Sequence, residues 1–76
     1  MKFDIFRNIV LSNANGRYIH YINSACGVLR NSISNRIYWK DKDESKYLEN
    51  TNRAKESYKS LSKVSKIPCL LEELEI

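Results

Sequence analysis

The apolar positions in the middle of the chain repeat at helical intervals. They follow one another at steps of three, four, three, four and four residues: Ile19, Ile22, Cys26, Leu29, Ile33 and Ile37. Residues spaced in this way lie along one face of an α-helix. The pattern predicts a helix over 16–38, with Asn15 as a candidate N-terminal cap.

A β-strand is the alternative for the beginning of this stretch. The run RYIHYI, residues 17–22, is rich in strand-forming residues, and Asn15-Gly16 after an apolar segment is typical of a hairpin turn. Strict alternation of apolar and polar residues then fails from Asn23 to Arg30. Because the helical series is longer than the alternating one, the sequence favours the helix.

A second periodic series follows and predicts a helix over 43–65. Its members are spaced by four, three, four, three and three residues: Tyr47, Thr51, Ala54, Tyr58, Leu61 and Val64. Asp41 and Glu44 have the spacing of a capping box at its start. Glu49 and Arg53 have the spacing of an ion pair one helical turn apart. Pro68 is expected to stop the helix.

The two ends of the chain give shorter patterns. Phe3, Phe6, Ile9 and Val10 stand at helical steps in an N-terminal arm, residues 1–14, which is expected to be a helical turn, an extended arm or a segment that orders on a partner. A tail, residues 66–76, carries leucines beside acids and is expected to form one amphipathic turn. The sequence therefore predicts a single all-α domain, a small helical hairpin with an extended or short-helical N-terminal arm.

Chain length bounds how this domain is stabilised. The 76 residues allow one small domain, and small domains bury a modest share of their surface. Disulfides, a metal or a partner often compensate for this. The spacing of Cys26 and Cys69 is not that of a disulfide framework. His20 has no second metal-binding residue at the spacing of a zinc site. A protein partner is therefore expected, and no metal or cofactor is predicted.

Charge is distributed unevenly along the chain. Residues 1–39 contain five basic residues and one acid, Asp4, whereas residues 40–76 contain eight of each. An acid-poor, arginine-bearing half is typical of a chain that meets nucleic acid or an acidic protein surface, and of mitochondrial targeting. A basic solvated face is the plain alternative.

Catalytic and membrane motifs are not evident in the sequence. Two glycines cannot supply a phosphate-binding loop. His20 has no serine or cysteine nearby at a spacing typical of a catalytic pair. The longest apolar run, Ile9 to Leu11, is far shorter than the roughly 20 residues of a transmembrane helix. An enzyme is the weakest class of function, and no direct membrane insertion is expected.

The run YIHYINSACGVLRNSI resembles the core motif of the epsilon subunit of mitochondrial ATP synthase. The family shows a tyrosine pair, a small pair, an aliphatic-arginine pair and a terminal leucine, matched here in order by Tyr18 and Tyr21, Ala25-Cys26, Leu29-Arg30, and Ile33. Gly16 stands near the family glycine but one residue too close to the tyrosines. The family tryptophan is absent, since Phe6-Arg7 lies too far upstream, and Ser34 replaces the final lysine.

The resemblance covers a stretch of about 16 to 18 positions. It implies a non-catalytic subunit of the rotating central stalk of ATP synthase. Such a subunit docks on the gamma and delta subunits at the foot of the central stalk, as part of a hetero-oligomer on the matrix side of the mitochondrial inner membrane. It uses no cofactor and no nucleic acid. The implied partner interface lies on the central helix: Tyr18, Ile19, Tyr21, Ile22, Ala25, Cys26, Leu29, Arg30 and Ile33.

Two other functions stay open on the residues alone. A small nucleic-acid-binding regulator would combine arginines for phosphates with aromatic rings for stacking: Arg17, Arg30 and Arg36 with Tyr18, Tyr21, Tyr38 and Trp39. The basic residues form no run, and the second half of the chain is neutral, which weakens this interpretation. A helical inhibitor or adaptor of another enzyme is the third possibility.

Overall fold

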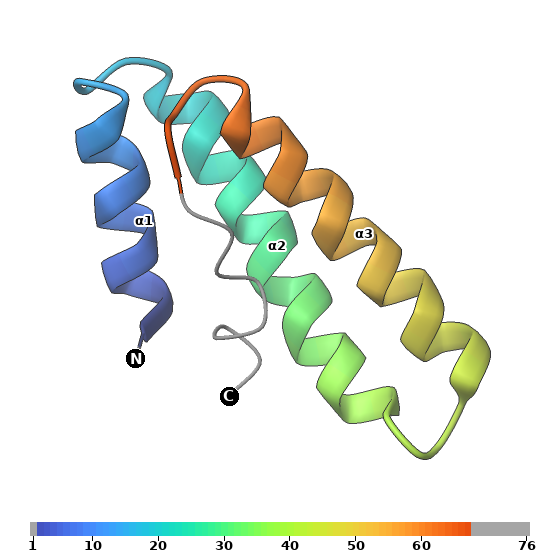
Figure 1. Cartoon of the computed structure of the whole chain (residues 1–76). Coiled ribbons are helices and arrows are strands. Elements are labelled where there is room, and N and C mark those ends of the chain that lie inside the picture. The colour runs from blue at the N-terminus through green and yellow to red at the C-terminus, as the bar shows by residue number, and fades with distance from the viewer. Residues whose placement is uncertain (1, 68–76) are drawn as a thin grey trace.

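Three helices make up the fold in the computed structural model, which describes residues 2–67. They are α1 (Lys2–Asn13), α2 (Ile19–Trp39) and α3 (Glu44–Ser62). Helices α2 and α3 run antiparallel as a helical hairpin, and α1 lies beside α2 (Figure 1). The prediction of an all-α fold is confirmed. The expected tail turn and the stop at Pro68 lie outside the described residues.

The link between α1 and α2 shows what the Asn15-Gly16 pair does. Asn15 has φ 56° and Gly16 has φ 72°, both in the left-handed region. The amide of Gly16 donates to the carbonyl of Leu11 at 3.2 Å, and that of Asn15 to Ser12 at 3.0 Å. These two bonds form a Schellman motif, which closes α1. Asn15 therefore terminates the first helix, and the prediction that it caps the second is wrong.

Helix α2 begins at Ile19, three residues after the predicted start. Its N-cap is Tyr18, with φ 59° and no capping hydrogen bond from its side chain. The three-residue difference arises because the Schellman motif and the left-handed Tyr18 occupy the intervening backbone. The helical interpretation is confirmed for 19–22, whereas Arg17 and Tyr18 belong to the link, and 17–22 contains no strand.

Helix α3 is capped by Asp43. The Asp43 side chain accepts a hydrogen bond from the amide of Lys46 at 3.1 Å, which satisfies one of the free N–H groups of the first turn. Asp41 instead has φ 65° in the turn before it, so the predicted capping box is wrong. The expected pair does form, with Arg53 Nη2 3.3 Å from Glu49 Oε1. The helix ends at Ser62, three residues earlier than predicted.

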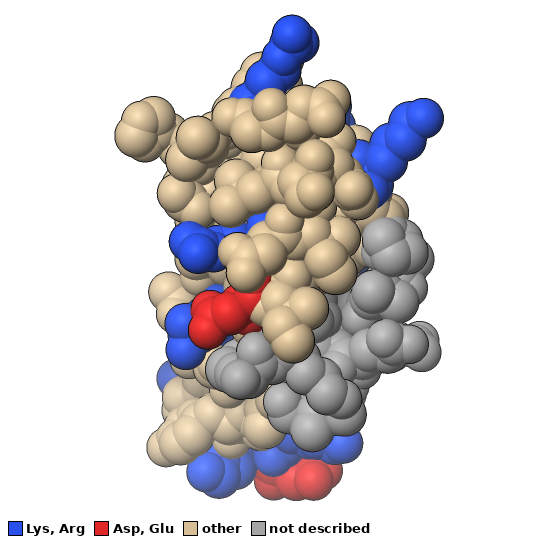
Figure 2. Space-filling view, turned by 90° about the vertical axis from the view of Figure 1, so that its left-hand side faces the viewer, with Lys and Arg blue, Asp and Glu red and all other residues tan. Residues whose placement is uncertain are grey.

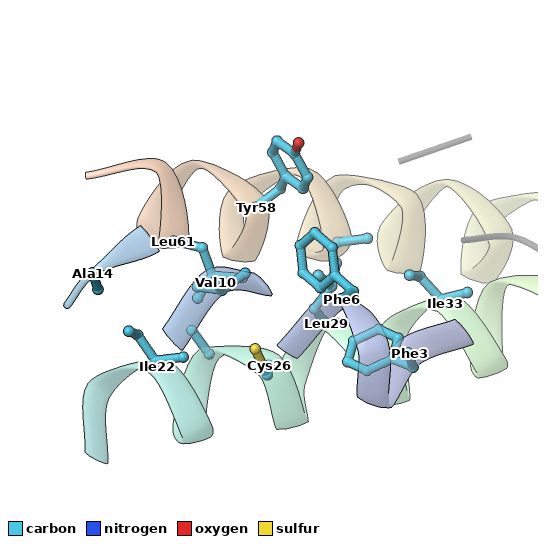
Figure 3. Close-up of a cluster of buried hydrophobic side chains, with 12 residues drawn as sticks. Phe3, Phe6, Val10, Ala14, Ile22, Cys26, Leu29, Ile33, Tyr58 and Leu61 are labelled. Atoms are coloured by element: carbon cyan, nitrogen blue, oxygen red, sulfur yellow. The ribbon is translucent and has the colours of Figure 1, made fainter. Parts of the chain in front are cut away.

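All three helices contribute to one hydrophobic core (Figure 3). Both predicted series supply its centre, while Ile19 and Ile37 at the ends of the first series remain 49% and 45% exposed. Each fully buried large apolar side chain stabilises the fold by about 1.5–3 kcal/mol. The buried apolar residues are Phe3, Phe6, Val10, Ala14, Ile22, Ala25, Cys26, Leu29, Ile33, Ala54, Tyr58 and Leu61.

Helix α1 is held on one side of the hairpin by contacts with both other helices. The ring of Phe6 stacks on that of Tyr58 with centroids 6.2 Å apart. Beyond α3, the buried Ser65 hydroxyl donates to the carbonyl of Val10 at 2.9 Å, and the Asn13 amide donates to the carbonyl of Lys66 at 2.7 Å. The N-terminal arm is therefore a helix of 12 residues, and it covers only one flank of α2.

Candidate functional site

The structure divides the nine predicted interface residues into two groups. Five of them are buried in the chain's own core: Ile22, Ala25, Cys26, Leu29 and Ile33. These side chains pack mainly inside the molecule, although Ala25 and Cys26 each also line a surface groove. Tyr18, Ile19 and Tyr21 are 56%, 49% and 44% exposed, and Arg30 is also exposed. The candidate interface is thus reduced to these four residues.

The four exposed residues do not share one face of α2. Tyr21 lines a groove between α2 and α3, whereas Arg30 lines a different groove between α1 and α2. The interface predicted from the sequence placed the tyrosine pair and Arg30 on one surface, whereas in the structure Tyr21 and Arg30 line different grooves. Two distinct surfaces on α2 are therefore available for binding.

The α2/α3 groove is lined by small residues together with exposed apolar and charged side chains. Its volume is about 290 Å³, and its lining consists of Tyr21, Ser24, Ala25, Val28, Arg53, Glu56, Ser57 and Ser60. Val28 is 42% exposed, close to the 44% of Tyr21. Small side chains allow another backbone to approach closely, while the ring and the isopropyl group offer apolar contact area. The groove can therefore seat an apolar segment of another protein.

Sequence reasoning missed Val28 because it lies outside the buried apolar series. A signal for it was present in the spacing. Val28 follows Tyr21 by seven residues, which is two helical turns, so the two side chains lie on the same flank of α2. A second apolar series on a helix whose first series is buried indicates an uncovered face.

The α1/α2 groove is polar at its rim. Its volume is about 270 Å³, and its lining consists of Phe3, Asp4, Arg7, Asn23, Cys26, Gly27 and Arg30. The Nη1 atom of Arg7 lies 3.4 Å from Oδ1 of Asn23, a long and exposed hydrogen bond. Arg7 and Asn23 were not predicted, since their proximity depends on how α1 packs against α2.

The Cys26 thiol lies at the floor of the α1/α2 groove and is 3% exposed. Burial raises the pKa of Cys26 above its ordinary value of 9.0, and the positive charge of Arg7 lowers it by a smaller amount. The thiol is therefore protonated at neutral pH. A neutral, buried thiol behaves as a small apolar side chain rather than as a nucleophile.

Cation–aromatic contacts gather at the tip of the hairpin, where α2 ends and α3 begins. The Lys42 ammonium lies 3.9 Å from the Tyr38 ring centroid, and the Lys46 ammonium lies 4.1 Å from that of Trp39. Arg36 donates to Tyr47 Oη at 2.7 Å and to a second side chain on α3. These contacts join the two helices at a point that α1 does not reach (Figure 1).

The residues of the nucleic-acid hypothesis are spread over separate parts of the structure. Tyr38 and Trp39 belong to the tip, Tyr21 to the α2/α3 groove, and Arg30 to the α1/α2 groove. A nucleic-acid surface normally combines its cations and stacking rings along one continuous track. Arg36, Tyr38 and Trp39 do meet at the tip, but Tyr21 and Arg30 lie in the two grooves, so the residues of the hypothesis form no single track.

Other kinds of site were sought in the same part of the chain. Within residues 2–67, no group of three or more histidine, cysteine or acidic side chains is placed to hold a metal ion. None of the three described helices has the length and apolar character needed to span a bilayer. No family model, curated protein or solved structure matches the chain.

Proposed function

We propose that the protein is a non-catalytic docking subunit that binds a larger protein through the exposed flank of α2. One observation carries this proposal. After α1 and α3 have packed on α2, Tyr21 and Val28 still project beside a groove floored by small residues. Contact residues of this kind, with tyrosine as an anchor, are typical of protein interfaces.

The dimensions of the molecule agree with such a role. A standard interface buries about 800 Å² on each partner. The chain measures 40 × 20 × 18 Å, so one long flank offers an area of this order. Since α1 covers only one side of the hairpin, the other side is open to a partner along its length.

The resemblance of residues 18–33 to the epsilon subunit makes the central stalk of mitochondrial ATP synthase the assembly to test first. Leu29 and Ile33 of that motif pack in the hydrophobic core, which supports a role for these two residues in stabilising the fold. Tyr21 and Arg30 lie at the surface, which supports their use as anchors. Ala25 and Cys26 pack mainly inside the chain, so we assign them first to its own core, where each also lines one of the two grooves.

The test is reconstitution from purified components. The chain is mixed with a gamma–delta stalk foot, and the mixture is separated by size-exclusion chromatography with light scattering. We expect the chain to co-elute with the foot at equal stoichiometry. Elution of the chain alone would contradict the stalk assignment. Recovery of the chain from native cells as a free monomer would contradict the docking function itself.

A further inference from the structure

The α1/α2 groove is flanked by two guanidinium groups that lack an acidic partner among the described residues. Arg7 contacts the neutral side-chain amide of Asn23, and Arg30 is exposed at the same rim. The arginines elsewhere on the helices are engaged differently. Arg53 pairs with Glu49, and Arg36 bonds to side chains of α3. Arg7 and Arg30 are therefore two helical arginines that border this hollow and pair with no acid among the described residues.

The surroundings of the groove leave this positive charge largely uncompensated. Asp4 is the single acid among residues 2–39, and it lies at the groove rim. The floor is formed by Phe3 and Cys26, which are 4% and 3% exposed. Figure 2 shows the molecule from the α1 side, where basic side chains follow one flank of a mostly uncharged face. A ligand here meets two cations above an apolar base.

We propose that the α1/α2 groove receives the carboxylate of a glutamate or aspartate side chain presented by the docking partner. This inference rests on the proposed function, because it names a chemical feature of the same partner. The planar guanidinium binds a carboxylate through two parallel hydrogen bonds, and such charged bonds are about twice as strong as neutral ones. The side-chain amide of Asn23 offers a further donor, and Phe3 packs against the methylene groups of the incoming side chain.

A single carboxylate fits the groove better than a nucleic-acid backbone does. A phosphate backbone is bound by several cations in a row, and its affinity grows with the number of phosphates that are neutralised. This groove holds two arginines, enough for one carboxylate but too few for a run of phosphates. Stronger binding of nucleic acid at this groove would therefore contradict the proposal in the experiment below.

The experiment uses the isolated full chain, labelled with nitrogen-15, and a short glutamate-rich peptide as the probe. Amide chemical shifts are followed by NMR during titration with this peptide and with its twin, in which glutamine replaces every glutamate. We expect saturable shifts centred on Asn23, Gly27 and Arg30. Since a hydrogen bond to a charged group contributes about 1.5–3 kcal/mol, the glutamine twin should bind at least roughly tenfold more weakly.

Arginine variants locate the binding to the groove. Arg7→Gln and Arg30→Gln should each lower the affinity for the glutamate peptide by roughly tenfold or more. Arg17→Gln is the matched control, because it removes the same charge from an exposed arginine that lines neither groove. We expect this control to bind the peptide with nearly the affinity of the parent chain.

Three outcomes would overturn the groove proposal: equal affinity for the two peptides, equal losses in Arg17→Gln and Arg30→Gln, or stronger shifts at the same amides with a single-stranded oligonucleotide. Failure of the proposed function looks different. If the peptide binds through Arg7 and Arg30 but the stalk foot does not co-elute, only the stalk assignment fails. If the foot co-elutes and the peptide result is negative, only the groove proposal fails.

Discussion

Replacing Leu29 by alanine is expected to remove a large part of the protein's free energy of unfolding. Leu29 has no exposed surface and lies where side chains of all three helices meet. A buried leucine-to-alanine change costs about 2–5 kcal/mol, because it removes apolar contacts and leaves a cavity. A domain of this size has a total stability near the lower end of about 5–15 kcal/mol. The loss is therefore a large part of the whole.

Leu48→Ala provides the matched control, since Leu48 is 50% exposed on α3. Its free energy of unfolding should stay within about 0.5 kcal/mol of the parent chain, as for most surface changes. Circular dichroism during urea unfolding measures both variants. Similar losses for Leu29→Ala and Leu48→Ala would contradict the burial of Leu29 and the exposure of Leu48 on which the core is assigned.

Replacing Tyr21 by alanine is expected to have the largest effect on binding. A tyrosine anchor at an interface contributes about 2 kcal/mol or more, which corresponds to a roughly thirtyfold loss of affinity. Because Tyr21 is 44% exposed in the chain alone, its removal should change stability far less than Leu29→Ala does.

Calorimetric titration of the stalk foot with Tyr21→Ala measures this loss. Tyr38→Ala is the control, because Tyr38 is 57% exposed but lies at the hairpin tip, away from the α2/α3 groove. The control should bind as the parent chain does. An unchanged affinity for Tyr21→Ala would remove this residue from the interface.

The helices could be predicted because their apolar residues repeat along the chain. The repeat from Ile22 to Ile33 fixed which side of α2 is buried, and the structure confirms it. The same repeat extended to Ile19 and Ile37, which are exposed. Burial there depends on where neighbouring helices begin and end, and α1 stops short of the tip. A pattern within one helix carries no information on the length of its neighbours.

The ends of the helices were predicted less well than their middles. Asn15 has the side chain of an N-cap, but its backbone is in the left-handed conformation that closes α1. Asp41 and Asp43 both suit the start of α3, and the structure selects Asp43 through its bond to the Lys46 amide. Asparagine and aspartate favour both caps and turns, so residue type alone does not separate the two uses.

The candidate sites depend on packing between helices and were only partly predictable. Tyr21 was chosen correctly as an exposed residue, but its neighbours in space, Arg53 and Glu56, come from α3. Arg7 meets Asn23 only because α1 folds back along α2. Motif spacing identified residues on one helix, whereas each groove needs two helices to exist.

The central claim is that a partner covers the exposed flank of α2. Hydroxyl-radical footprinting of the tyrosines, on the free chain and on its complex with the stalk foot, tests this most directly. The account predicts that Tyr21 reacts in the free chain and is protected in the complex, while Tyr38 reacts equally in both. Equal reactivity of Tyr21 with and without the bound foot would contradict the account.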